Sequence, residues 1–326
     1  MNLRDKILNP ACPLVFYELI PPKLGDSAEL ERLIETCRAL SGKVDAINIP
    51  EIVEETRWGA GGKKTPERLE PRRFGSEIQS ATGLETIINR ITVRESEASQ
   101  RKWLQECYQD YAIRNLILVG GESSDIPYPG PSVEAMAKCA REEKLDFLLG
   151  GITIPSRSRE GTRIRDKHQQ GVAFFTTQVL LDSNDIVDLI QDLNGIDVRI
   201  MLSLAPVSNV RDLQFLKHLG VDVPNNVMWA IEQAGGTEKA LEKSIALATG
   251  ILTDVFNNLP EHPPALGINI EQITRRNFHA ALQLLEQIAP FYRRHVQARF
   301  PAEGSRWQSE HLFGPARRDR SSQSAE

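Results

Sequence analysis

Short apolar runs alternate with longer amphipathic segments along most of the chain. The runs are nearly continuous in apolar and β-branched residues, which is typical of strands buried on both faces of a parallel sheet. The predicted strands cover residues 14–20, 44–49, 85–93, 115–120, 147–154, 174–181, 199–204 and 265–270.

Between these runs, apolar residues recur at helical spacing, as Leu30, Leu33, Cys37 and Leu40 do in the first segment. The last helix is expected to stop before Pro290, because proline lacks the N–H that a helix interior needs. The predicted helices cover residues 26–40, 96–111, 132–143, 161–170, 184–193, 209–219, 226–258 with a break at 235–236, and 273–288.

Eight strand–helix units in about 290 residues favour a single-domain (β/α)8 TIM barrel. We assign residues 14–300 to this barrel, 1–13 to an N-terminal extension and 301–326 to a disordered tail. A doubly wound open sheet is the alternative, but the turn at 21–25 (PPKLG) lacks a glycine-rich phosphate loop. The basic segment 57–73 is either a solvated loop or an anion-attracting lid.

Composition excludes several classes of protein. A hydrophobic share of 40% with 25% charged residues is typical of a globular chain. The net charge of −5 gives no pull toward nucleic acid or an anionic membrane, and no apolar run is long enough to cross a bilayer. The four cysteines are scattered and the histidines lack metal-ligand spacing, so we expect a cytoplasmic protein with no metal site.

In a TIM barrel the active site lies at the carboxyl ends of the strands. Glu18 lies within an apolar strand, where burial would raise its pKa toward the range of a general acid; the alternative is a salt bridge inside the barrel. Glu122 follows Gly120 and Gly121, and is either a ligand contact or a carboxylate at a helix N-terminus. Gln178 binds either a polar heterocycle or neighbouring strands. Further polar residues at strand ends are Asn48, Glu51, Arg90, Thr92, Arg94, Asn269, Glu271, Arg275 and Arg276.

Several segments resemble the methylenetetrahydrofolate reductase family. The family resemblance runs from about residue 14 to 290, and it implies a TIM barrel that passes a hydride from NAD(P)H through FAD to 5,10-methylenetetrahydrofolate. The segments that carry it are 16–23 (FYELIPPK), 116–122 (LILVGGE), 167–182 (KHQQGVAFFTTQVLLD) and 205–209 (APVSN).

The resemblance also implies roles for individual residues. Glu18 matches the acid that assists opening of the folate ring, Gln178 matches a glutamine that contacts folate, and Glu122 matches an aspartate that touches pterin and flavin. Either Arg275 or Arg276 replaces the basic residue that follows the eighth strand, and Arg275 is expected to bind substrate. The implied set of residues that bind the cofactors FAD and NAD(P)H is Thr92, Gly120, Gly121, Glu160, Arg163 and Lys167.

Some flavin positions of the family are altered. The His-x-Thr of the third strand is Arg90-Ile91-Thr92 here, and the Tyr-Pro segment after the fifth strand is 154–158 (IPSRS). Either FAD binds in an atypical way or the hydride passes directly from NAD(P)H. A folate-dependent methyltransferase or demethylation component, and a non-catalytic folate-binding subunit, are the alternative functions. A homo-oligomer is compatible with the sequence.

Overall fold

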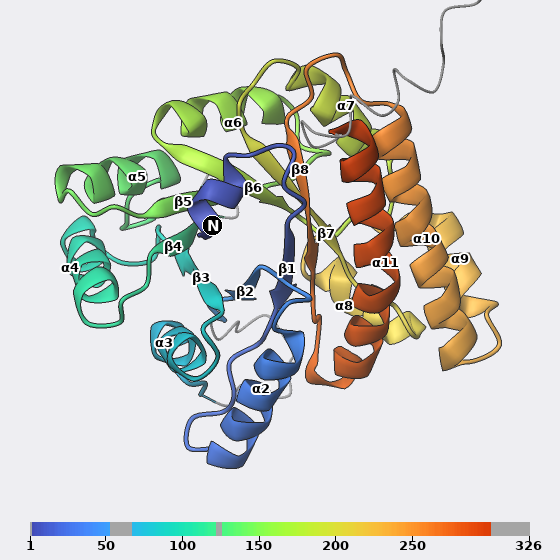
Figure 1. The fold of residues 1–326 in the computed structure, drawn as a ribbon, viewed down its shortest axis with the longest axis horizontal. Coiled ribbons are helices and arrows are strands. Elements are labelled where there is room, and N and C mark those ends of the chain that lie inside the picture. Colours follow the sequence, from blue (N-terminus) through green and yellow to red (C-terminus); the bar gives the residue numbers. More distant parts are fainter. Residues whose placement is uncertain (1, 53–66, 122–125, 301–326) are drawn as a thin grey trace, which may run out of the picture.

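The computed structural model describes residues 2–52, 67–121 and 126–300. Eight parallel strands follow one another in chain order around a closed barrel, and β8 pairs with β1 to complete it. Helices surround the barrel on the outside (Figure 1). The predicted single-domain TIM barrel is therefore confirmed, and the open-sheet alternative is wrong.

The strands are β1 (Val15–Glu18), β2 (Ala46–Ile49), β3 (Glu85–Ile91), β4 (Asn115–Val119), β5 (Leu148–Thr153), β6 (Val172–Thr177), β7 (Arg199–Leu204) and β8 (Ala265–Ile270). The helices are α1 (Leu3–Ile7), α2 (Ser27–Leu40), α3 (Pro71–Thr82), α4 (Glu97–Gln109), α5 (Val133–Glu142), α6 (Glu160–Gln169), α7 (Asn184–Asp192), α8 (Val210–His218), α9 (Asn225–Glu232), α10 (Thr237–Asn257), the short 3₁₀ turn η1 (Arg275–Asn277) and α11 (Phe278–Arg299).

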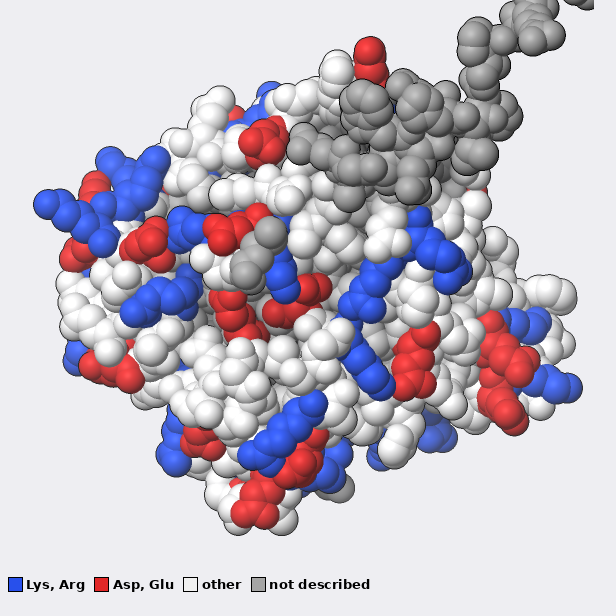
Figure 2. All heavy atoms as spheres, viewed as in Figure 1, with Lys and Arg blue, Asp and Glu red and all other residues white. Residues whose placement is uncertain are grey.

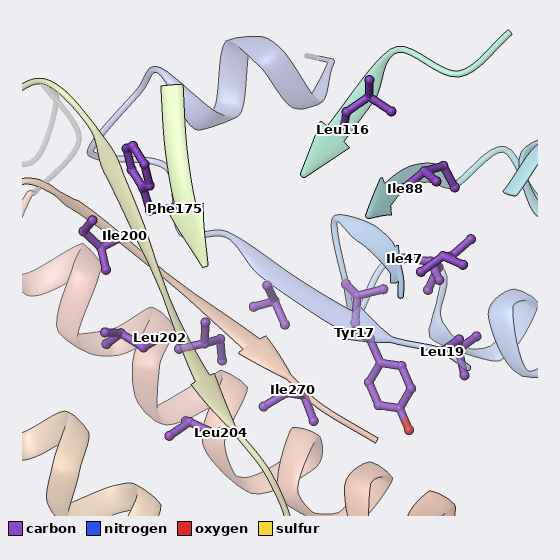
Figure 3. Packing of buried hydrophobic residues seen from close by; sticks show 14 of the residues in the cluster. Tyr17, Leu19, Ile47, Ile88, Leu116, Phe175, Ile200, Leu202, Leu204 and Ile270 are labelled. Carbon is purple, nitrogen blue, oxygen red and sulfur yellow. The ribbon is translucent and has the colours of Figure 1, made fainter. Parts of the chain in front are cut away.

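Successive residues of each strand point alternately out to the helices and in to the barrel axis. Outward residues such as Tyr17, Ile47 and Leu202 pack in one large cluster between strands and helices (Figure 3). Inward residues such as Phe16 and Phe174 fill the amino-terminal half of the barrel, with their rings 6.0 Å apart. This half is a packed core, so ligands have to bind at the carboxyl ends of the strands.

The N-terminal segment closes the bottom of the barrel. Leu3 and Ile7 on α1 are buried in the same cluster as Phe16, and Figure 1 shows this helix lying across the opening. Arg199 points inward from β7, and its guanidinium donates hydrogen bonds to backbone carbonyls of the segment and of β8. The carbonyls belong to Lys6, Ile7, Asn9, Cys12 and Leu266.

The sequence analysis missed helix α3, which begins inside the segment 57–73 that was expected to be a loop. Its N-terminus has ordinary helix signals: Pro71 opens the helix, and the carboxylate of Glu70 accepts from the backbone N–H of Arg73 at 3.1 Å. Gly75 lets the helix lie against β3, because a Cβ there would be 2.8 Å from Cδ1 of Ile88. The segment is rich in basic residues and only a narrow face of the helix is buried, so the sequence pattern did not predict a helix. Residues 57–66 lie outside the described residues.

Two predicted boundaries are also wrong. Strand β6 ends at Thr177, whereas the apolar run of the sequence continues to residue 181 in a buried loop. Helix α11 passes through Pro290 and ends only at Arg299. Pro290 and Glu286, whose carbonyl loses its donor, are both on the exposed face of the helix, so water can satisfy that carbonyl.

The distribution of surface charge and the state of the cysteines agree with what the composition predicted. Figure 2 shows acidic and basic side chains interspersed over the face that carries α1. No helix within the described residues is both long and apolar enough to cross a bilayer. All four cysteines are free thiols, and three of them are buried; burial raises the pKa of Cys37 and Cys107 to about 12, so these two are structural.

Replacing Arg199 with methionine should destabilise the fold strongly. Several buried carbonyls would lose their donor, and each unsatisfied acceptor costs about 1–3 kcal/mol, so we expect a loss of about 3 kcal/mol or more in urea unfolding. Arg4→Met is the matched control, because Arg4 makes exposed contacts with Asp146, an ion pair at 2.8 Å and a hydrogen bond to its carbonyl at 3.2 Å; the substitution should cost under about 1 kcal/mol. Equal losses for the two variants would show that Arg199 does not fasten the N-terminal segment.

Candidate functional site

A cavity of about 1230 Å³ opens at the carboxyl ends of β1, β2, β3 and β8 and extends along α8. Apolar side chains form part of its wall, and four carboxylates and five arginines also line it, Asp212 of α8 being the fourth carboxylate. The apolar residues include Ile20, Ile52, Ile91 and Ile273, the carboxylates of the strand ends are Glu18, Glu51 and Glu271, and the arginines are Arg68, Arg94, Arg211, Arg275 and Arg276. The cavity therefore combines apolar walls, buried acids and cations.

Glu18 is the last residue of β1 and points into the barrel, because Phe16 points inward and side chains alternate along a strand. Burial, and secondly the nearby carboxylate of Glu271, raises the pKa of Glu18 well above its ordinary value. Burial therefore favours the protonated form of Glu18, which is the form a general acid needs. Among the described residues Glu18 has no salt bridge, and its charged neighbour is another acid.

Glu271 was among the polar residues at strand ends but received no role from sequence. It follows β8, and its backbone N–H donates to the carbonyl of Leu204 at 2.9 Å, so the strand geometry continues through it. Burial raises its pKa to about 7, while hydrogen bonds from the side chains of Ser203 and Asn269 oppose that rise. Strand alternation could have identified Glu271 from the sequence: it lies two residues after Asn269, so both side chains face the same side of the sheet.

A layer of buried polar side chains surrounds these acids. Asn48, Thr176 and Asn269 are at most 2% exposed, and each has an oxygen without a hydrogen-bond partner among the described residues. Asn48 lies beside Glu18 in the register of β1 and β2. Buried polar atoms are nearly always paired with protein, water or ligand, so this layer can bind water or a polar ligand.

Two other charged residues of the cavity are fixed by ion pairs. Arg275, predicted to contact substrate, does line the cavity, where it pairs with Glu29 of α2. Glu51 pairs with Arg90 at 2.7 Å and accepts from the backbone N–H of Ile91 at 2.6 Å. Arg90 points outward and stacks over the ring of Trp103, so Glu51 and Arg90 mainly fasten β2 to β3.

The structure does not bring Gln178 to Glu18. Gln178 follows β6 instead of lying within it, and it lines a separate cavity of about 220 Å³. Its side-chain amide donates to the carbonyl of Leu219 at 3.4 Å, and Leu219 lines the large cavity. The end of α8 therefore lies between Gln178 and that cavity. Glu122 lies outside the described residues.

Two residues predicted to bind cofactor, Thr92 and Gly121, lie against other parts of the protein. Thr92 is fully buried, and its hydroxyl donates to the carbonyl of Val119 at 3.3 Å. A Cβ on Gly121 would lie 2.3 Å from the ring of Tyr128, so this glycine makes room for a tyrosine. Gly120 is half-buried at the end of β4, where a Cβ would meet only ordinary contact with Val133.

Glu160, Lys167 and Arg163 form a second group near the end of β5. Glu160 is 3% exposed, and one of its oxygens accepts from the Thr153 hydroxyl at 2.9 Å and the Ile154 N–H at 3.1 Å. Lys167 reaches the carbonyl of Ile152 at 3.4 Å, and burial lowers its pKa. Arg163 is exposed, with its Nε 4.0 Å from Glu160. These contacts stabilise the turn between β5 and α6.

Comparison with known proteins supports the resemblance seen in the sequence. No family model matches the chain. A protein named 5,10-methylenetetrahydrofolate reductase from Pectobacterium carotovorum subsp. carotovorum is 24% identical over 260 residues, which cover 75% of this chain and 80% of that protein. Over most of its length the chain is therefore similar to a protein of this name. A solved structure from Clostridium thermocellum, of an uncharacterized protein described as binding two copies of 5-methyl-5,6,7,8-tetrahydrofolic acid, shares the fold with a TM-score of 0.67. It is 20% identical and covers 89% of this chain and 99% of its own.

The flavin contacts implied by this reductase family do not fit the described residues. Thr92 is fully buried with its hydroxyl bonded to a carbonyl, and a side chain on Gly121 would clash with the ring of Tyr128. Glu160 uses one oxygen on the backbone and hydroxyl of its own turn, while its other oxygen has no hydrogen-bond partner among the described residues. A flavin group would have to displace the internal contacts of Thr92 and of the first Glu160 oxygen. Glu18 and Arg275, for which substrate roles were predicted, instead line one cavity.

Glu160→Gln should reduce stability, because a carboxylate that accepts two buried hydrogen bonds is replaced by an amide that accepts them more weakly. We expect a loss of about 1–3 kcal/mol in urea unfolding. Arg163→Gln changes an exposed charge of the same group and should cost under about 0.5 kcal/mol. A stable Glu160→Gln protein with impaired cofactor binding would instead support the flavin role.

The stability of the protein should fall as the pH rises through the titration of Glu271. Its pKa is raised from the ordinary 4.5 to about 7, so its favourable contribution is complete below pH 4.5 and is lost as the pH passes about 7. Glu271→Gln should therefore be more stable than the native chain at pH 8, by on the order of 2 kcal/mol, and equal to it near pH 4.5. Chemical unfolding at both pH values measures this difference. The exposed Glu261→Gln serves as control and should show no such pH-dependent gain.

Proposed function

We propose that the chain binds a reduced folate in the large cavity and reduces 5,10-methylenetetrahydrofolate to 5-methyltetrahydrofolate with a hydride from NAD(P)H. The observation that carries this proposal is the inward-facing Glu18, an acid that burial keeps protonated inside the cavity. The named reductase relative points to the same reaction, and the structural neighbour is described as binding its product.

The chemistry of the cavity suits a folate. A flat pterin and an aminobenzoyl ring need apolar walls, which Ile20, Ile91 and Ile273 supply. The negatively charged glutamate of a folate suits a cavity lined by arginines, which can bind carboxylates in a bidentate manner. The volume of about 1230 Å³ exceeds the ~300–1,000 Å³ of ordinary small-molecule pockets, which leaves room for a nicotinamide beside the folate.

We assign the hydride to NAD(P)H directly, without FAD as carrier. The residues that would hold the flavin make internal contacts instead, as described for Thr92, Gly121 and Glu160. Direct transfer requires both substrates in one cavity, with the nicotinamide C4 next to the methylene carbon of the folate. The reaction balances with one hydride from NAD(P)H and one proton from the site.

Glu18 supplies the proton in this proposal. Its carboxylic acid protonates N10 of the substrate, the bond between N10 and the methylene carbon breaks, and an iminium forms at N5. The hydride then adds to the methylene carbon, which gives the methyl group and NAD(P)⁺. Glu18 is left as a carboxylate and regains its proton from solvent before the next turnover.

Glu18→Gln tests this role. The amide keeps the shape of the side chain but has no acidic proton, so we expect kcat to fall by about 100-fold or more while the protein stays folded. The assay is oxidation of NADH or NADPH that depends on 5,10-methylenetetrahydrofolate, and Glu261→Gln is the control. Unchanged turnover in Glu18→Gln would remove Glu18 from the mechanism.

Adding FAD from zero to the same assay tests the source of the hydride. We expect turnover at zero FAD on protein without flavin absorbance, and no increase as FAD is added. Turnover that appears only with FAD would overturn the direct transfer but keep the reductase. Binding of 5-methyltetrahydrofolate without turnover with either nicotinamide would favour the non-catalytic folate-binding alternative, which the description of the Clostridium protein makes a specific rival.

A further inference from the structure

Two carboxylates meet where the barrel closes. Strands β1 and β8 pair in parallel, with Tyr17 opposite Ile270, so the next residues along each strand, Glu18 and Glu271, lie side by side. Neighbouring strands are about 4.8 Å apart, and both side chains point to the same face of the sheet. Both line the large cavity. The fold therefore forces two acids into one small volume, which like charges resist unless a proton is shared.

The two acids have different neighbours. Glu271 accepts a hydrogen bond from Nδ2 of Asn269 at 3.3 Å and one from the hydroxyl of Ser203. Both partners are fully buried donors that favour the ionised form of Glu271. On its other side, Glu18 has Asn48 in register. The first negative charge of the pair therefore belongs on Glu271, and the proton on Glu18.

Other charged groups face the pair from every surrounding segment. Several of them have partners of their own: Glu51 pairs with Arg90, Arg275 pairs with Glu29, and Arg68 donates to the carbonyl of Pro21 at 2.8 Å. Asp212 of α8 accepts from Ser208, Asn209 and Asn277. Arg94, Arg211, His218 and Arg276 also line the cavity. These partners leave the carboxylate of Glu271 as the charge that lies beside Glu18 in the same sheet.

We propose that Glu271 is a positioning residue that keeps the catalytic proton on Glu18, so that the two carboxylates hold one proton between them at neutral pH. The catalytic part of this inference rests on the proposed function. When Glu18 protonates the folate, the pair changes from one negative charge to two, at the moment when the substrate becomes a cationic iminium. The second carboxylate thus also favours the charge that develops in the reaction.

The pair can be tested without turnover, by following carboxyl protonation with infrared difference spectra of the folded protein. Glu271 ionises while Glu18 is neutral, so Glu18→Gln should leave the midpoint of Glu271 in place. Glu18 ionises against the charge of Glu271, so Glu271→Gln should move the midpoint of Glu18 to lower pH by about one unit or more. Glu261→Gln, an exposed glutamate, should move neither midpoint.

The proposal would be overturned if the midpoint of Glu18 were the same in the native chain and in Glu271→Gln. It would also be overturned if only Glu18→Gln caused a shift, that of the Glu271 midpoint. Should Glu271→Gln fail to fold, Ser203→Ala replaces it. Loss of this donor should raise the midpoint of Glu271, and an unchanged midpoint would overturn the assignment of the negative charge to Glu271.

The pH dependence of kcat links the pair to the reaction. Activity requires protonated Glu18, so Glu271→Gln should lose activity at lower pH than the native chain and approach native activity in acid. A loss at the same pH in both proteins would overturn the positioning role while leaving the reductase intact. Carboxyl midpoints that shift as expected, in a protein with no turnover, would keep the pair and reject the proposed function.

Discussion

Closure of the barrel between β8 and β1 is the constraint on which the site depends. The first and last strands are separated by more than 200 residues, yet their register places Glu18 against Glu271 and Phe16 against Asn269. Burial inside the closed barrel raises the pKa of both acids, and for Glu18 the carboxylate of Glu271 adds to that rise. The fold brings the two together because a sheet of eight parallel strands leaves no edge when β8 returns to β1.

Such a pair costs stability, and the rest of the barrel has to offset that cost. The amino-terminal half is a packed apolar core with Arg199 fastening the N-terminal segment beneath it. The carboxyl half contains amides and hydroxyls in place of a tightly packed apolar layer, among them Asn48 and Thr176. This division lets one end of the barrel supply stability while the other holds groups whose burial is unfavourable but chemically useful.

Much of the architecture was predictable from sequence because a parallel barrel repeats one local pattern. Eight apolar runs gave the strands, and Glu18 was identifiable as an acid within such a run. Helix α3 was missed because its buried face consists only of Phe74, Gly75 and Ile78. Glycine has no side chain, so Gly75 adds nothing to an apolar pattern at helical spacing. Gln178 was misplaced because a buried loop after β6 is as apolar as the strand before it. The partnership of Glu271 with Glu18 depends on a register between distant strands, which no local pattern contains.

Contacts with neighbours that a local pattern does not contain also explain why only some of the roles implied by the family resemblance agree with the structure. A resemblance transfers residue positions, but a residue keeps its role only if its neighbours leave it available. Thr92, Gly121 and Glu160 stand where the family suggests cofactor contacts, yet each is engaged by a nearby residue of this chain. Glu18 and Arg275 keep access to the cavity because they line it from strand ends and a following turn. The large cavity thus holds an acid and a cation together, while Thr92 and one oxygen of Glu160 make contacts within the protein.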